Sequence, residues 1–123
     1  MNATMVVFLI VCLFVIFTFF RNRSTMRKVA ALIKNGALGV DVRSGQEYRD
    51  GHFGAAINVP YEECERRIAE FGTDKTRPII LYCHAGSRSA VAHGVLKKHG
   101  FGKVINARSY AAMQRFERNA ARS

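Results

Sequence analysis

The first twenty residues of this 123-residue chain contain no charged side chain, and every Lys, Arg, Asp and Glu follows Phe20. The run from Ala3 to Phe20 also lacks glycine and proline. A secretory signal normally starts with positive residues and ends in a small-residue cleavage site, and neither pattern is present. At about 1.5 Å per residue, this run spans roughly 27 Å as a helix, close to the hydrocarbon thickness of a bilayer. We therefore expect residues 1–23 to form a retained transmembrane anchor, in contact with lipid through residues 3–20.

Positive charge is absent before the apolar run and concentrated directly after it, at Arg21, Arg23, Arg27 and Lys28. The positive-inside rule then places the rest of the chain, residues 24–123, in the cytoplasm, with the anchor in the inner membrane. The formal net charge is +10. No nucleic-acid-binding motif accompanies it, so we interpret the basic cluster as a solvated segment beside anionic lipid head groups.

Cysteine is scarce, with three residues at positions 12, 64 and 83. Their spacing suggests no disulfide framework, which agrees with a reducing compartment. No group of residues has metal-ligand spacing, and the glycines form neither a dinucleotide-binding nor a phosphate-loop fingerprint. We expect no metal and no cofactor.

The segment after the anchor alternates between strand-like and helix-like patterns. Ser24 and Thr25 are candidate N-caps for a helix in "MRKVAALIKNG", and Ser44 with Glu47 forms a capping box. The strand-like segments are "ALGVDV", "AINVP", "RPIILYC" and "KVINA", and further helices are expected in "YEECERRIAEFG", "SAVAHGVLKKHG" and "YAAMQRFERNAA". This alternation predicts an α/β fold whose mostly parallel sheet is flanked by helices on both faces.

The stretch "YCHAGSRS" places Cys83 where the most apolar strand ends and a helix begins. Ligands of such sheets bind at the carboxyl ends of the strands. Unpaired N–H groups and the helix dipole stabilise a thiolate there, and the small residues Ala85, Gly86 and Ser87 allow the backbone to form an anion nest. A buried, inert cysteine is the alternative, but this setting favours a nucleophile.

The length of the loop separates two kinds of chemistry. His84, Ala85, Gly86 and Ser87 lie between Cys83 and Arg88. Cysteine-dependent phosphatases have one more residue between their Cys and Arg, because a tetrahedral phosphate needs a wider cradle. A single extra sulfur atom on the cysteine fits the shorter loop, so the spacing favours sulfur transfer.

Three segments, "DVRSGQEYRDGHFGAAINVP", "IILYCHAGSRS" and "LKKHGFGKVINA", resemble the single-domain rhodaneses, which are thiosulfate-type sulfurtransferases. Within that family the chain resembles the small phage-shock rhodaneses, and we expect one transmembrane helix to precede this domain. The resemblance implies that Cys83 takes a sulfane sulfur from a small anionic donor such as thiosulfate and passes it from a persulfide to a thiol or to cyanide. It also implies that the amides of residues 84–88 cradle the persulfide and that Arg88 braces the loop.

The resemblance gives mostly structural roles to Asp41, Arg43, Glu47 and His52, and we expect an ion pair between Arg43 and Glu47. Arg108 and Ser109 replace a Gly-Gly pair that the family often has, Gly54-Ala55 replaces Pro-Gly, and no tryptophan is present. A Gly-Gly turn permits positive φ, so we expect the turn here to take another path or to expose Arg108. Arg108 then either leans toward the mouth of the pocket or points to water and lipid. The family's short strand before the first helix is expected to be missing.

Two other functions stay open: an inactive rhodanese-like binding or scaffold module at the membrane, and a relative of phosphatases or arsenate reductases. His84 is expected to face solvent, and His93 and His99 to be surface or packing residues. Cys64 would resolve the persulfide as a disulfide only if the fold brought it close to Cys83.

Overall fold

The structure is a computed structural model that describes residues 1–122. It contains one sheet of four parallel strands. The strand order is β2-β1-β3-β4, so β3, which leads to Cys83, is a central strand. This confirms the predicted α/β architecture. In chain order the elements are α1 (Ala3–Lys34), β1 (Leu38–Asp41), α2 (Gly45–Asp50), β2 (Ile57–Asn58), two 3₁₀ turns η1 (Tyr61–Glu63) and η2 (Ile68–Phe71), β3 (Ile79–Cys83), α3 (Ser87–Lys98), β4 (Val104–Ser109) and α4 (Tyr110–Ala121).

Strand β3 is buried along its whole length and separates two apolar clusters. Ile79, Leu81 and Cys83 point to one face, where α3 and the 3₁₀ turns pack. Ile80 and Tyr82 point to the other face, where they meet the second half of α1 and the first half of α4. Side chains alternate between the faces of a strand, so this continuous apolar run is what a strand covered on both faces requires.

Helix α1 runs without interruption from Ala3 to Lys34, through the predicted end of the anchor at residue 23. The predicted new helix start at Ser24 and Thr25 is wrong. Thr25 donates its hydroxyl to the carbonyl of Arg21, one turn earlier, and caps nothing. Residues 21–26 contain neither glycine nor proline, so nothing in them stops the helix. Val29, Leu32 and Ile33 do share a face, and that face packs on the sheet.

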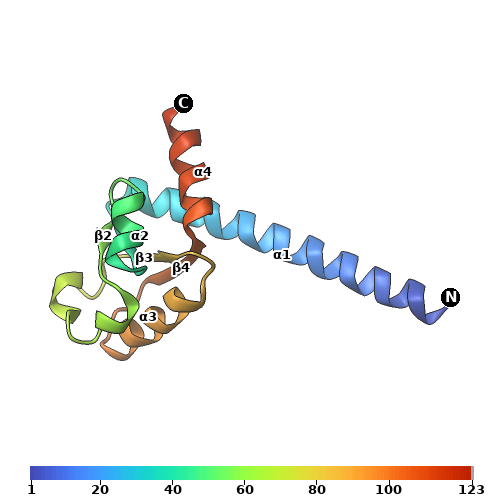
Figure 1. Ribbon diagram of the computed structural model, residues 1–123, viewed down its shortest axis with the longest axis horizontal. Helices are drawn as coiled ribbons and strands as arrows, with labels where there is room; N and C mark the ends of the chain where they lie inside the picture. The colour runs from blue at the N-terminus through green and yellow to red at the C-terminus, as the bar shows by residue number, and fades with distance from the viewer. Residues whose placement is uncertain (123) are drawn as a thin grey trace.

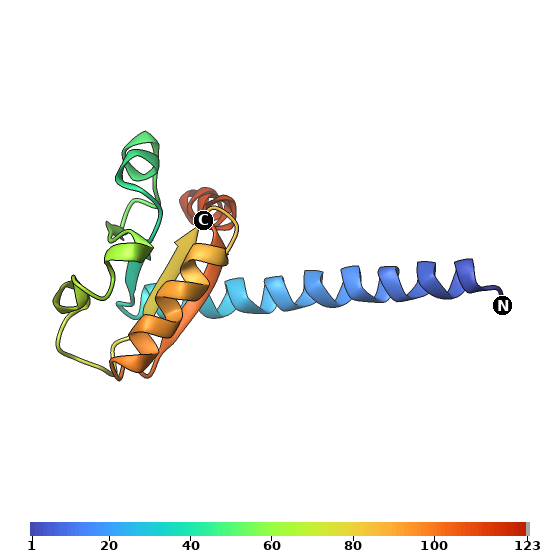
Figure 2. The ribbon, with the colours of Figure 1, turned by 60° about the horizontal axis from the view of Figure 1, so that its bottom comes forward.

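The N-terminal part of α1 projects away from the sheet as a single rod (Figure 1). Within residues 1–122, α1 is the one helix long and apolar enough to cross a bilayer, with a mean hydropathy of 2.9 and none of its most apolar stretch buried. No strand precedes it in that range, as expected. Helix α4 crosses α1 beside the point where the rod leaves the domain (Figures 1 and 2).

The segment 61–71 departs from its predicted single helix. It forms the two 3₁₀ turns η1 and η2, in which short bonds such as Glu70 N–H to Arg67 O and Gly72 N–H to Ala69 O replace most α-helical ones. The side chain of Arg67 reaches back to the carbonyl of Asn58, which holds this compact path. Phe71 is buried, so its apolar side chain faces inward although the backbone forms a tighter coil than an α-helix.

Candidate active site

Cys83 is the last residue of β3, and Gly86 is the N-cap of α3. Gly86 has a φ of 111°, a left-handed conformation that only glycine adopts at little cost. This conformation turns the N–H of Gly86 back toward Cys83, to which it donates a hydrogen bond at 2.9 Å from Sγ. The sharp turn is therefore what lets the backbone of the loop stabilise negative charge on the sulfur.

The sulfur of Cys83 is enclosed, with 1% of the residue exposed. Burial alone would raise the pKa of the thiol. The side chain of Ser89 and the N–H groups of Ser89, Gly86 and Ala85 outweigh burial and lower the pKa of Cys83 below its usual 9.0. A thiolate at this position is thus available closer to neutral pH than in a free cysteine.

Ser89 was not singled out from the sequence, yet its hydroxyl lies 3.4 Å from Cys83 Sγ. It also lies 2.7 Å from Asn106 Oδ1 and 3.1 Å from the carbonyl of Gly86. One hydroxyl proton can serve only one acceptor at a time. Ser89 can accept from the thiol while it donates to Asn106, or turn its proton toward a thiolate. The signal available in the sequence was its position three residues after Gly86, in the first turn of α3.

Asn106 ties this hydroxyl to the opposite wall of the site. Its Oδ1 accepts from Ser89 and, at 2.8 Å, from the N–H of Arg108, while its Nδ2 donates to the carbonyl of Gly86. The amide therefore joins the loop that follows Cys83 to the end of β4. Sequence reasoning missed Asn106 because its pairing with Ser89 depends on α3 and β4 meeting in space.

The turn at Arg108 keeps positive φ, at 72°, although it contains no glycine. Of the two expected outcomes, another path or an exposed Arg108, the turn does not show the first, because it keeps the positive φ that a Gly-Gly pair would permit; Arg108 itself is half-buried. A register irregularity between β3 and β4 places Arg108 opposite Tyr82 and Ser109 opposite Cys83. The carbonyl of Arg108 consequently lies 3.6 Å from Cys83 Sγ and accepts its thiol proton. The side chain passes Gly86, and its Nη1 lies 3.4 Å from Asn22 Oδ1 on α1, with the residue half-buried.

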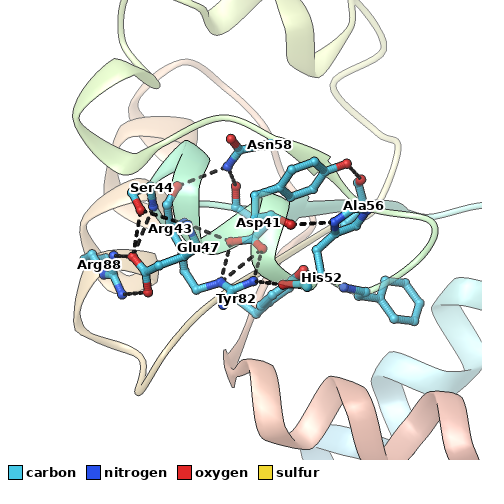
Figure 3. Close-up of polar contacts among 12 residues, drawn as sticks. Asp41, Arg43, Ser44, Glu47, His52, Ala56, Asn58, Tyr82 and Arg88 are labelled. Atoms are coloured by element: carbon cyan, nitrogen blue, oxygen red, sulfur yellow. Dashed lines mark hydrogen bonds and ion pairs between the residues drawn. The ribbon is translucent and has the colours of Figure 1, made fainter.

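Arg88 forms a bidentate ion pair with Glu47, at 2.6 and 3.0 Å (Figure 3). Glu47 is also the third residue of α2 and closes the predicted capping box with Ser44. The hydrogen bonds from Arg88 dominate the stabilisation of its carboxylate, and the pKa of Glu47 falls to about 2. The arginine that ends the loop is thereby fastened to α2, which agrees with its expected bracing role.

The expected ion pair between Arg43 and Glu47 is wrong, because Arg43 pairs with Asp41 at 2.6 Å (Figure 3). Asp41 ends β1, and Arg43 lies at a bend two residues later, where both its N–H and its guanidinium donate to the Asp41 carboxylate. Asp41 is completely buried and needs a cation, whereas Glu47 lies at the rim within reach of α3. Arg43 also donates to the carbonyl of Gly51 and stacks over the ring of Tyr110.

The remaining candidate residues divide between the surface and the scaffold. His84, Ala85 and Ser87 are exposed at the rim of the loop. His52 stacks on Tyr48 and places Nδ1 2.8 Å from its carbonyl oxygen, a structural arrangement. His93 Nε2 lies 3.1 Å from the carbonyl oxygen of Val104, and His99 Nε2 lies 2.9 Å from Glu65 Oε1.

Cys64 lies in the apolar cluster on the face of the sheet that α3 covers, and burial raises the pKa of its thiol to about 11. Its Sγ lies near the carbonyls of Val59 and Pro60, and all three cysteines are free. In the part of the chain that the structure describes, no group of three or more His, Cys, Asp or Glu is placed to hold a metal ion.

A sequence model of the rhodanese-like domain matches residues 25–111, which include the whole sheet and the loop that follows Cys83. The chain belongs to the rhodanese family. It is 38% identical over 68 residues to the thiosulfate sulfurtransferase PspE of Escherichia coli K12, a match covering 55% of this chain and 65% of that protein. It is 39% identical over 67 residues to the putative sulfur carrier protein YrkF of Bacillus subtilis 168, covering 54% and 35%.

A solved rhodanese with anions from E. coli superposes with a TM-score of 0.59 at 34% identity. The superposition covers 63% of this chain and 91% of that one. The matches span less than two thirds of the two curated relatives. Helix α1 before residue 25 lies outside the family match.

Proposed function

We propose that this rhodanese is a membrane-anchored sulfurtransferase that carries a sulfane sulfur on Cys83. The observation that supports this most directly is the cradle around Sγ: the Gly86 N–H at 2.9 Å, the Ser89 hydroxyl at 3.4 Å and a lowered pKa. Groups that favour a thiolate also favour the anionic terminal sulfur of a persulfide, because both are soft anions that accept N–H hydrogen bonds. The similarity to PspE agrees with this chemistry.

In the first half-reaction the Cys83 thiolate attacks the outer sulfur of a donor such as thiosulfate. The sulfur–sulfur bond of the donor breaks, its electron pair leaves with sulfite, and Cys83 becomes a persulfide. In the second half-reaction cyanide or a thiolate attacks the outer sulfur, and the electron pair returns to Cys83 as thiolate. No net oxidant or reductant is consumed in the exchange with cyanide, so the site needs only a nucleophile and an anion cradle.

Arg88 serves this chemistry through position. Its guanidinium is held by Glu47, so it supplies positive charge behind the loop while keeping α2 and α3 together. The loop amides of residues 84–88, and not the guanidinium, are the groups we propose for contact with the transferred sulfur.

Mass spectrometry of the protein after thiosulfate treatment tests the proposal. We expect one added sulfur atom on Cys83, lost again on addition of cyanide with release of thiocyanate. Cys83→Ser should abolish both steps, because an alkoxide leaving group cannot replace the thiolate, while Cys64→Ser should retain them. Sulfur transfer by Cys83→Ser would refute the proposed nucleophile.

We further propose that α1 spans the inner membrane and that the rhodanese domain faces the cytoplasm. The support is the length and hydropathy of the helix and the four cations that directly follow Phe20. A reporter fused after residue 123 should be active in its cytoplasmic form and silent in its exported form. A mature chain that lacks residues 1–20, or complete release by carbonate, would instead indicate a cleaved signal or a peripheral protein.

A binding or scaffold role is the second candidate, and two observations favour it: the enclosed sulfur and the Arg108 turn beside it. The mass measurement distinguishes the two, because a module without activity would acquire no sulfur from thiosulfate.

A further inference from the structure

A cavity of about 640 Å³ lies between α1 and α4, on the side of the domain from which the apolar rod emerges. Its wall combines three arginines with apolar side chains from both helices: Phe19, Arg23, Met26, Arg27, Arg115 and Phe116. It is separate from the catalytic loop, because no residue from 83 to 89 lines it. A lining of this kind suits a ligand with an anionic group joined to an apolar body.

The three arginines lack acidic partners. Across residues 1–122 no ion pair involves Arg23, Arg27 or Arg115. The one acidic side chain of α4, Glu117, accepts the N–H of Gly54 at 2.7 Å. Arg23 lies over the ring of Phe19, with its guanidinium carbon 5.7 Å from the ring centre. The cavity therefore concentrates positive charge that no ion pair within residues 1–122 neutralises.

The position of the cavity identifies where an anion would come from. Phe19 belongs to the last turn of the apolar run, and at about 1.5 Å per residue Arg23 and Arg27 lie roughly 5 to 10 Å beyond its end. That is the depth of the head-group layer of a bilayer. Helix α4 lies crosswise to α1 in both views, so it runs along the membrane surface when α1 spans the bilayer (Figures 1 and 2).

We propose that this cavity binds the phosphate of one anionic phospholipid, such as phosphatidylglycerol. The guanidinium groups of Arg27 and Arg115 would approach the phosphate from the two helices, since planar guanidinium forks suit bidentate contact with phosphate oxygens. Phe19, Met26 and Phe116 supply the apolar side against which the glycerol and the first acyl carbons lie. The inference rests on the proposed membrane anchoring and does not depend on the chemistry of Cys83.

Binding there would connect α4 to the membrane surface. Because Ser109 is both the last residue of β4 and the N-cap of α4, and lies opposite Cys83 in the sheet, the lipid would help fix how the catalytic edge faces the membrane.

The test uses the full-length protein in neutral detergent micelles, titrated with short-chain phosphatidylglycerol, with phosphatidylcholine of the same chain length, or with inorganic phosphate. The variant is Arg27→Gln/Arg115→Gln. Its matched control is Lys28→Gln/Arg118→Gln, which removes the same charge from the same two helices at side chains outside the cavity lining. We expect saturable binding of phosphatidylglycerol that weakens about tenfold or more in the cavity variant and less than about threefold in the control.

Equal weakening in both double variants would overturn the site in favour of general surface attraction. Equal binding of phosphatidylcholine would remove the selectivity for anionic lipid, and displacement of the lipid by low millimolar phosphate would indicate a site for a soluble anion. If the proposed anchoring is wrong because the apolar segment is cleaved, the mature chain will lack Phe19, and this result is distinguishable from any of the lipid-binding outcomes. Failure of sulfur transfer leaves every lipid measurement unchanged.

Discussion

Arg88 and Glu47 face each other across the rim of the loop that follows Cys83 in a two-point ion pair, at 2.6 and 3.0 Å. Arg88 belongs to the first turn of α3 and Glu47 to the first turn of α2. The pair therefore joins α3, the helix that follows Cys83, to α2, the helix that follows β1. Its carboxylate is strongly favoured over the acid, which makes the contact dependent on pH.

Glu47→Gln should destabilise the protein at neutral pH by about 1 kcal/mol, a small value because the pair is about one-third exposed to solvent. The pKa of Glu47 falls from 4.5 to about 2 on folding. Its contribution is thus fully present above pH 4.5 and is lost as the pH falls toward 2. Urea unfolding in micelles at several pH values measures this. Glu62→Gln, at an exposed site, is the control, and a difference that persisted at the lowest pH would contradict the assignment.

Ser89→Ala should move the pH dependence of Cys83 alkylation to higher pH. The variant loses a hydroxyl that lowers the pKa of this thiol, while burial, which raises it, remains. The rate of reaction with iodoacetamide, followed by peptide mass spectrometry against pH, gives the shift. Ser87→Ala, at the exposed neighbouring position, should leave the profile in place. A profile unchanged in Ser89→Ala would mean that the backbone amides alone hold the thiolate.

Asp41→Asn should cost about 3 kcal/mol of unfolding free energy, because it leaves the buried guanidinium of Arg43 without its counter-charge. Denaturation with urea measures the loss, and Asp50→Asn, an exposed change, should cost less than about 0.5 kcal/mol. The double variant Asp41→Asn/Arg43→Met should be less destabilised than the sum of its single changes. Additive costs would show that the two side chains act independently.

Arg108→Gly should be more stable than Arg108→Ala by about 1 kcal/mol, because alanine retains the cost of positive φ and glycine does not. Both variants remove the contact with Asn22, so their difference isolates the backbone. Thermal unfolding of the pair measures it. Equal stabilities would mean that the turn relaxes to another conformation when the arginine side chain is removed.

The sequence was sufficient to predict features that depend on residues close to one another along the chain. The apolar run ending at Cys83 predicted a strand, the spacing of Ser44 and Glu47 predicted a capping box, and both are present. The small residues after Cys83 predicted a backbone whose N–H groups turn inward, and the left-handed Gly86 directs its own N–H to the sulfur.

The sequence did not predict pairs of residues that come together only when the chain is folded. Glu47 has arginines within chemical reach at positions 43 and 88, and the choice depends on Asp41 being fully buried and needing Arg43. Ser24 and Thr25 have cap-forming side chains, but these residues serve equally well inside a helix when nothing forces it to end. The contact of Ser89 with Asn106 requires α3 and β4 to be packed together first.

Because α1 is a continuous helix, its apolar N-terminal part and the domain have a fixed rotation relative to each other, unlike two parts joined by a flexible linker. A helix turns about 100° for each residue, so one residue inserted near position 24 would rotate the domain, with Cys83, by about that angle around the helix axis and shift it along the axis by only about 1.5 Å. Inserting a whole turn of residues would restore the original rotation at a greater distance along the axis. Under the proposed membrane anchoring, the number of residues between Phe20 and Val29 therefore sets both the rotation of Cys83 about the helix axis and its distance from the bilayer.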